Sequence, residues 1–144
     1  MKSYFEISNS FEEDSSIVIA TKDSLEEIKN LPNEKFKLIL TSPPYNIGKS
    51  YETQTKLDVY LEWQENILVE LVRILHSNGS LVLQVGTFVN NGEMFPLDFY
   101  FYPICKKLGL QLRNRIVWHF EHGLHSTKKL SGRYEVLLWF TKTK

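Results

Sequence analysis

One short segment, Thr41-Ser42-Pro43-Pro44-Tyr45-Asn46, combines residue types that could hold a flat ring and act on an amine attached to it. Ser42 supplies a hydroxyl, Tyr45 supplies an aromatic ring, and the backbone between them supplies carbonyl acceptors. Neither proline has an N–H to donate, and Pro44 pushes Pro43 toward extended geometry, so we expect a rigid elbow. Such an elbow suits a planar base whose exocyclic amine donates hydrogen bonds.

The elbow directly follows an apolar run, Phe36-Lys37-Leu38-Ile39-Leu40, which is typical of a buried strand. It should therefore stand at the carboxyl end of that strand, which is where open α/β sheets bind their ligands. The loop after it, residues 47–55, is polar and irregular, as loops that carry functional side chains often are.

Strands and helices are expected to alternate along the chain, which indicates an α/β fold of three layers with a mostly parallel sheet. The last two strands are separated by a loop alone, so they should form an antiparallel hairpin. With no internal repeat or linker, residues 1–144 are interpreted as one domain with a loosely ordered lead-in at 1–15. The expected strands are 16–20, 36–41, 80–86, 110–120 and 134–142, separated by helices at 25–31, from Asp58 to a cap at Asn78-Gly79, and at 95–108, with a loop at 86–93.

The composition is that of an ordinary folded protein. Its 144 residues carry 17 basic and 17 acidic side chains, so any basic surface for nucleic acid must be local. A single cysteine, Cys105, excludes an internal disulfide and fits a reducing compartment. The first residues are polar and acidic, unlike a signal peptide, and no apolar run approaches the ~18 residues of a membrane span. We therefore expect a cytoplasmic protein without membrane contact.

The elbow resembles the catalytic motif, Ser/Asp/Asn-Pro-Pro-Tyr, of the DNA methyltransferases that modify exocyclic amino groups. Four further stretches resemble this family in the same order, so that the likeness covers roughly residues 17–142. They are Lys22-Asp23-Ser24, Leu61 to Gly86, Arg115-Ile116-Val117-Trp118-His119, and Gly132-Arg133-Tyr134-Glu135 with Leu138-Trp139-Phe140.

The resemblance implies a Rossmann-like methyltransferase fold, S-adenosyl-L-methionine as cofactor and double-stranded DNA with a flipped base as substrate. Serine at the first position of the motif resembles the enzymes of restriction-modification systems that methylate N4 of cytosine. N6 of adenine stays open as an alternative target, because the correlation between this residue and the base is imperfect.

The resemblance also assigns roles to individual residues. Ser42, Pro43, Pro44 and Tyr45 are the expected catalytic residues. Asp23, Ser24, Thr41 and Ser42 are the expected cofactor-binding residues, although Asp23 also suits a helix cap. Residues expected to contact DNA are Asn46, Lys49, Tyr51, His119, Lys128, Lys129 and Arg133.

Structural alternatives to some of these roles remain at the level of sequence. The polar loops that carry the expected DNA contacts could simply be solvated. Arg133 and Glu135 share a face of the last strand, where they could orient the base pocket or take part in an ordinary cross-strand ion pair. No metal is expected, since the histidines lack the cysteine or carboxylate partners of a zinc site. Cys105 is interpreted as a buried core thiol, and not as the thiolate nucleophile of a C5-cytosine methyltransferase.

The chain resembles the first part of a permuted class in which a recognition region and a Phe-x-Gly-x-Gly cofactor loop follow later. No Gly-x-Gly occurs in these 144 residues. In the family's strand order, 3-2-1-4-5-7-6, strands 1 and 2 would be missing, and the strand at 36–41 would have a bare apolar edge. We therefore expect an incomplete fold that a second chain or a homodimer completes. The alternative is a non-catalytic remnant or half-subunit that binds DNA or a partner.

Overall fold

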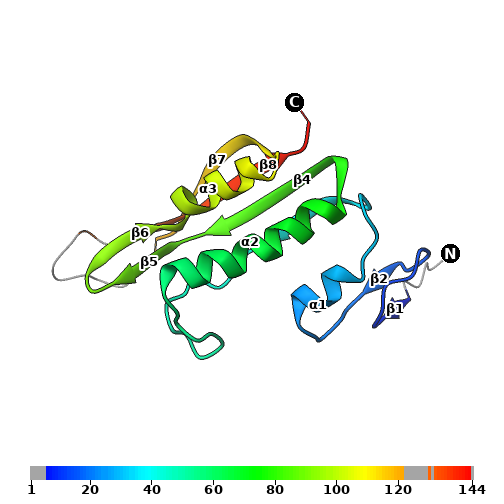
Figure 1. Cartoon of the computed structure of the whole chain (residues 1–144), viewed down its shortest axis with the longest axis horizontal. Coiled ribbons are helices and arrows are strands. Elements are labelled where there is room, and N and C mark those ends of the chain that lie inside the picture. Colours follow the sequence, from blue (N-terminus) through cyan, green and yellow to red (C-terminus); the bar gives the residue numbers. More distant parts are fainter. Residues whose placement is uncertain (1–5, 122–129, 131, 144) are drawn as a thin grey trace. The chain divides into compact units, whose positions relative to one another are not determined.

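The structure, a computed structural model, describes residues 6–121, 130 and 132–143 (Figure 1). The backbone divides into two compact units, Met1–Pro32 and Asn33–Lys144, which are described separately. No helix in the described part of the chain is long and apolar enough to cross a membrane.

The first unit contains two short strands and one helix. Strands β1 (Ile7–Ser8) and β2 (Ile17–Val18) pair in parallel, so a strand lies within the expected lead-in and the strand expected at 16–20 is only two residues long. Helix α1 (Ser24–Lys29) begins after Asp23, whose Oδ1 accepts a hydrogen bond from the Glu26 backbone N–H. The capping role considered for Asp23 is therefore confirmed.

The second unit is built on a four-stranded sheet with the order β3-β4-β8-β7. Its strands are β3 (Phe36–Thr41), β4 (Leu75–Val85), β7 (Gln111–His119) and β8 (Tyr134–Thr141). Only β3 and β4 pair in parallel, so the expectation of a mostly parallel sheet is wrong for this chain, whose sheet is mixed. The reason is that β2 pairs with β1 in the first unit, while the hairpin of β7 and β8, predicted as antiparallel, contributes both antiparallel pairings.

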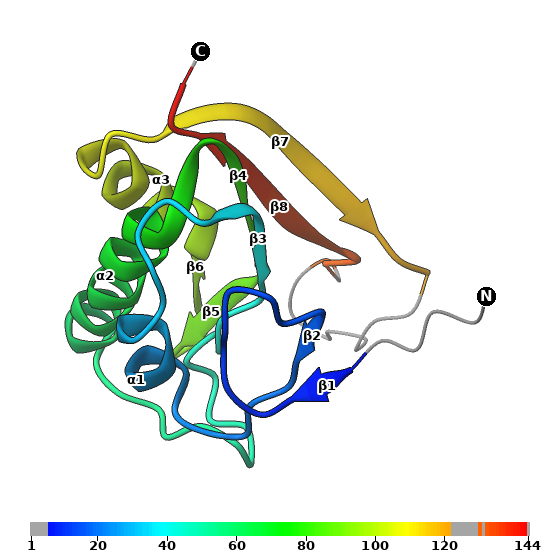
Figure 2. The same cartoon turned by 90° about the vertical axis from the view of Figure 1, so that its right-hand side faces the viewer.

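Two helices, α2 (Leu57–Ile74) and α3 (Leu97–Lys107), cover one face of this sheet (Figure 2). Buried side chains alternate along β4 and β8, and together with side chains from both helices they form the core. The fully buried members include Leu68, Leu75, Leu81, Leu83, Leu97, Phe101, Leu110, Leu138 and Phe140. Within this unit the structure thus shows two of the three expected layers, the sheet and one layer of helices.

Helix α2 ends earlier than expected, at Ile74, and strand β4 follows without a loop. Gly79 is not a left-handed cap, but lies buried inside β4. A Cβ at Gly79 would lie 3.0 Å from the Phe36 backbone oxygen, so the glycine permits a close approach of two strands. The Asn78-Gly79 cap was therefore the wrong interpretation of this glycine.

The segment expected to be a loop at 86–93 instead contains a hairpin. Strands β5 (Thr87–Asn90) and β6 (Glu93–Pro96) pair antiparallel around Asn91 and Gly92, which both have positive φ. Asn-Gly is the strongest short hairpin signal, because both positions of its tight turn need positive φ. Helix α3 follows directly and continues through Pro103, so this proline does not shorten it.

The opposite face of the four-stranded sheet carries exposed apolar side chains. Leu38 and Leu40 are 63% and 66% exposed on β3, which is an edge strand of this sheet. Trp118 on β7 is 54% exposed and lies opposite Glu135. No described element of Asn33–Lys144 covers these residues, which is unusual because folded proteins normally shield apolar edge strands.

Candidate functional site

The pairing of the strands brings the elbow and two other predicted site residues, His119 and Arg133, to the same end of the sheet strands. Thr41 at the end of β3 pairs with Leu83 near the end of β4, and Val85 pairs with Val136 near the start of β8. His119, the last residue of β7, pairs with Tyr134. The elbow after β3, His119 at the end of β7 and Arg133 before β8 therefore all lie at the same end of the sheet strands.

The Tyr45 ring packs directly on the backbone of Gly86. A Cβ at Gly86 would lie 2.6 Å from Tyr45 Cε2, so only glycine leaves room for the ring in this position. The Tyr45 hydroxyl lies 3.1 Å from Ser42 Oγ and donates to Glu135 Oε2 over 3.3 Å. Gln84 Nε2 donates to the same carboxylate oxygen over 2.5 Å. These four side chains form one hydrogen-bonded chain, which we call the elbow network.

The environment makes the Tyr45 hydroxyl harder to deprotonate than that of a free tyrosine. Burial raises the pKa of Tyr45, and the negative charge of Glu135 raises it further, while the hydrogen bond with Ser42 lowers it. Ser42 itself is exposed, so its hydroxyl can reach a ligand.

The carbonyl of Pro44 is already used within the protein. The Tyr60 hydroxyl donates to it over 2.7 Å, and the Tyr60 ring is buried in helix α2 with its pKa raised by burial. This hydrogen bond ties the elbow to the first turn of α2. Ser42 Oγ and the Pro43 carbonyl are therefore the elbow acceptors that we consider for a ligand.

Asn46 closes the loop that follows the elbow. Its side-chain amide donates to the Thr55 carbonyl and accepts from the Thr55 N–H, both over 2.8 Å, and the residue is only 2% exposed. Glu52 accepts from the backbone N–H groups of Asn46 and Ile47 over 2.9 and 3.0 Å. We call this set of hydrogen bonds the loop clasp.

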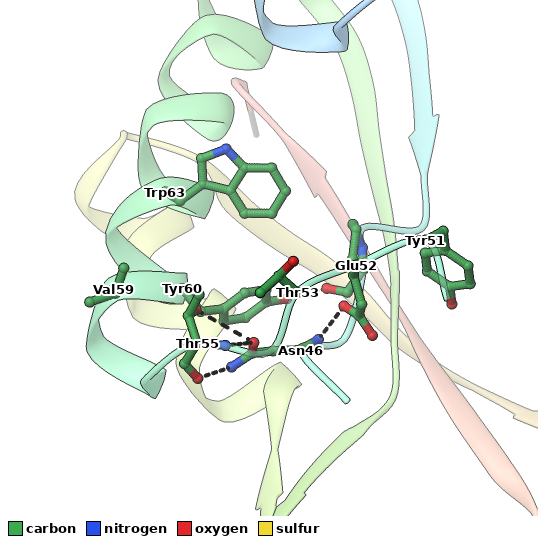
Figure 3. Close-up of a pocket in the computed structure, with 9 residues that line it drawn as sticks. Asn46, Tyr51, Glu52, Thr53, Thr55, Val59, Tyr60 and Trp63 are labelled. Carbon is green, nitrogen blue, oxygen red and sulfur yellow. Dashed lines mark hydrogen bonds between the residues drawn. The ribbon is translucent and has the colours of Figure 1, made fainter. Parts of the chain in front are cut away.

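A cavity of about 490 Å³ lies between the clasped loop and the start of α2. Figure 3 shows Asn46 and Thr55 joined at one end of it, Trp63 from α2 at the other, and Tyr51 beyond Glu52. Its lining is formed by Pro44, Asn46, Tyr51, Glu52, Thr53, Thr55, Val59, Tyr60 and Trp63.

Residues 36–144 match the family described as DNA methylase, of N6 and N4 type. This chain belongs to that family. Curated relatives include the type II methyltransferase M.BglII of Bacillus subtilis, 47% identical over 122 residues, which are 84% of this chain and 34% of the relative. The DNA adenine methyltransferase YhdJ of Escherichia coli K12 is 32% identical over 83% of this chain and 39% of the relative. The chain thus spans less than half the length of these relatives.

Solved structures of DNA methylases agree on the fold. The cytosine-N4-specific PvuII DNA methyltransferase superposes with a TM-score of 0.73 at 22% identity, over 86% of this chain and 48% of that one. TTHA0409 of Thermus thermophilus, described as a DNA modification methylase, superposes in complex with S-adenosyl-L-methionine with a TM-score of 0.68 at 26% identity, over 85% and 54% of the two chains. The predicted Rossmann-like methyltransferase fold is thereby confirmed.

The predicted site residues of this DNA methylase chain lie in different surroundings. Asn46 is buried in the loop clasp, whereas Tyr51 is 72% exposed and Lys49, His119 and Arg133 are also exposed. Asp23 and Ser24 stand at the start of α1 in the first unit. Lys128 and Lys129 lie outside the described residues. The roles of all these residues in binding remain predictions.

Gln84 was absent from the predicted site, and Glu135 was considered only, together with Arg133, as a residue that could orient the base pocket. Gln84 and Glu135 lie on one face of neighbouring strands and both reach toward Tyr45, which the sequence does not reveal without the register of β4 and β8. Among the described side chains, the Glu135 carboxylate accepts hydrogen bonds from Tyr45 and Gln84, and no ion pair joins it to Arg133. Nor do three or more potential metal-binding side chains gather anywhere in the described residues.

Cys105 is confirmed as a core thiol of this DNA methylase chain. It is fully buried on helix α3, and burial raises its pKa to about 12. A thiol must be deprotonated to act as a nucleophile, so Cys105 is unsuited to that role at neutral pH.

We expect Gly86→Ala to displace the Tyr45 ring, because the added Cβ would overlap ring carbons. Overpacking of this kind typically costs about 1–3 kcal/mol, and a shift of the ring would disturb its hydrogen bond to Glu135. The chemical shift of Tyr45 in a protein with ¹³C-labelled tyrosine reports the displacement. Gly132→Ala is the control, since a Cβ there meets no described atom within 4 Å. An unchanged Tyr45 signal in Gly86→Ala would contradict the packing.

We expect Asn46→Ala to loosen the loop after the elbow. The change removes both hydrogen bonds of the Asn46 amide to Thr55, each worth about 0.5–1.5 kcal/mol, so we expect a total cost of about 1–3 kcal/mol. Urea denaturation measures this cost, and limited proteolysis within residues 47–55 should become faster. Asn66→Ala, at an exposed position of α2, is the matched control. Equal stability of the two variants would argue against the clasp.

Proposed function

We propose that this chain carries the catalytic part of a DNA methyltransferase that moves a methyl group from S-adenosyl-L-methionine to N4 of cytosine. The observation that supports this most is the elbow, in which the exposed Ser42 hydroxyl and the half-buried Tyr45 ring lie together at the carboxyl ends of the sheet strands. Serine at position 42 favours cytosine as the target.

The exocyclic amine of a base is a poor nucleophile, because its lone pair is delocalised into the ring. Acceptors that hold the two N–H groups make the nitrogen more tetrahedral and direct its lone pair toward the methyl group. Ser42 Oγ and the Pro43 carbonyl supply such acceptors, and fixed dipoles of this kind act without reorganising during the reaction. Tyr45 would stack on the base, which must leave the duplex to be reached.

The residues assigned to the cofactor are compatible with it. Asp23 is exposed and its cap uses Oδ1, so Oδ2 remains to accept a hydrogen bond from the adenosine part. Ser24, Thr41 and Ser42 would add polar contacts. The cofactor, when bound, supplies the electrophilic methyl group, and the related TTHA0409 was crystallised with S-adenosyl-L-methionine.

We propose that further polypeptide completes the fold and the cofactor site, either in a second chain or in a larger protein. Two observations support this. The chain covers about a third to a half of its relatives, and β3 presents exposed Leu38 and Leu40 at a sheet edge. A homodimer paired through β3 is the alternative. We propose that DNA contacts Lys49, Tyr51, His119, Lys128, Lys129 and Arg133. The protein would act in the cytoplasm.

Two alternative functions are distinguished by the experiment described in the next paragraph. Methylation at N6 of adenine is favoured by the 32% identity to the adenine methyltransferase YhdJ. A non-catalytic half-subunit that binds DNA or a partner is favoured by the absence of Gly-x-Gly from the sequence.

The decisive experiment incubates DNA and S-adenosyl-L-methionine with two proteins and identifies methylated nucleosides by mass spectrometry. One is the chain alone, and the other is M.BglII in which this chain replaces the matching third of the enzyme. We expect N4-methylcytosine from the chimera, and none from the chain alone. N6-methyladenine would support the alternative target. A folded chimera without activity, beside active M.BglII, would refute a catalytic role for this chain.

A further inference from the structure

The Glu135 carboxylate receives two hydrogen bonds on one oxygen. Gln84 Nε2 lies 2.5 Å from Oε2 and the Tyr45 hydroxyl lies 3.3 Å from it. An ionised carboxylate can only accept hydrogen bonds, so both neighbours must donate. Gln84 therefore anchors the carboxylate from within the sheet, and Tyr45 commits its single proton to Glu135.

This arrangement fixes the direction of the remaining hydrogen bond. Tyr45 Oη lies 3.1 Å from Ser42 Oγ, and either oxygen could donate if the pair stood alone. Because the Tyr45 proton is committed to Glu135, Ser42 must donate to Tyr45. The lone pairs of Ser42 Oγ are then directed away from Tyr45, and the side chain is exposed to a ligand.

We propose that Glu135 is a positioning residue that sets the direction of the elbow network, so that Ser42 accepts a hydrogen bond from the exocyclic amine of the target base. The inference rests on the proposed function for the identity of the ligand. It assigns to Glu135 a role through Tyr45 and Ser42, without contact with the base.

The direction of the network has a consequence for base selection. An amine such as N4 of cytosine donates to Ser42, whereas a carbonyl at the same position, as in uracil, would place an acceptor against an acceptor. Sites built to pair with a particular donor reject analogues that lack it, because the buried groups are left unpaired. With glutamine at 135, the amide can present N–H to Tyr45, and Ser42 is then free to donate to a carbonyl.

The first measurement needs no enzymatic activity. The ¹³Cζ signal of Tyr45 is followed against pH in the 144-residue protein, with the assignment made by Tyr45→Phe. We expect Glu135→Gln to lower the pKa of Tyr45, since Glu135 raises it through its charge and its hydrogen bond. Glu93→Gln, at an exposed position of β6, should leave it unchanged. An unchanged Tyr45 pKa in Glu135→Gln overturns the proposal.

The second measurement compares the affinity of the same protein for a base that carries an exocyclic amine with its affinity for a base that carries a carbonyl. Fluorescence anisotropy compares thymine oligonucleotides that carry one central cytosine or one central uracil. We expect the wild-type protein and Glu93→Gln to prefer cytosine by about tenfold, the equivalent of one hydrogen bond, and Glu135→Gln to lose that preference. If the role of Glu135 were merely structural, Glu135→Gln would weaken the binding of both oligonucleotides equally. An unchanged ratio of the affinities for the cytosine and uracil oligonucleotides therefore also overturns the proposal.

The two measurements separate this proposal from the proposed function. If the wild-type protein shows no preference for cytosine, the proposed target base is wrong, while the lowered Tyr45 pKa in Glu135→Gln still supports the direction of the network. If the preference is present but Glu135→Gln retains it, the target base stands and the role of Glu135 fails.

Discussion

Replacing Tyr45 by alanine is expected to reduce methyl transfer by the chimera with M.BglII by on the order of a hundredfold. Two losses combine, since stacking of a base on an aromatic ring is worth about 1–3 kcal/mol and the Ser42 hydroxyl loses the partner that orients it. The measurement is the initial rate of methyl incorporation into DNA at saturating cofactor.

Tyr45→Phe separates the two losses, because it keeps the ring and removes only the hydroxyl. We expect it to retain much of the DNA affinity while the rate falls. Tyr102→Ala, at an exposed position on helix α3, is the control for loss of an aromatic ring. Equal rates for Tyr45→Ala and Tyr102→Ala would show that the elbow is not the site of methyl transfer.

Replacing Phe101 by alanine is expected to cost about 3–5 kcal/mol of the free energy of unfolding, which is the largest stability effect we predict. Phe101 on α3 is fully buried, and its ring meets the Tyr60 ring at a centroid distance of 6.5 Å. The change would leave a cavity between the helices, where the elbow is anchored through Tyr60. Urea denaturation followed by circular dichroism measures the loss.

Phe99 on the same helix provides a matched control, since its side chain is 69% exposed. Phe99→Ala should change stability by less than about 0.5 kcal/mol. If Phe101→Ala fails to fold, Phe101→Leu leaves a smaller cavity and should show an intermediate cost. Similar stabilities for the variants at 99 and 101 would mean that α3 does not pack as described.

The elements that position the elbow could be predicted because local rules determine them. The apolar run before Pro43 identified β3, and the short connection between β7 and β8 correctly indicated an antiparallel pair. The hairpin at Asn91-Gly92 was missed although its signal is local, because the glycine was interpreted as part of a loop. Gly79 was misread for a different reason, since its role depends on a strand that lies far earlier in the sequence, at Phe36.

The elbow network could not be predicted from local patterns. Glu135 lies 90 residues from Tyr45 in sequence and 51 from Gln84. Their meeting depends on the register of β4 against β8 and on the absence of a side chain at Gly86. The resemblance to the family included the segment around Glu135. Only the paired strands show that the Glu135 carboxylate accepts hydrogen bonds from the Tyr45 hydroxyl and from Gln84.

The loop clasp also affects the thermodynamics of recognition. Ordering the backbone of a free residue costs about 1–2 kcal/mol of conformational entropy. If the loop at residues 47–55 were flexible, it would lose this entropy when a nucleotide binds. Because Asn46 is hydrogen-bonded to Thr55 and Glu52 to the loop backbone, the loop loses this entropy when the chain folds. The loop is thus preorganised, so more of the contact energy with a nucleotide can appear as affinity.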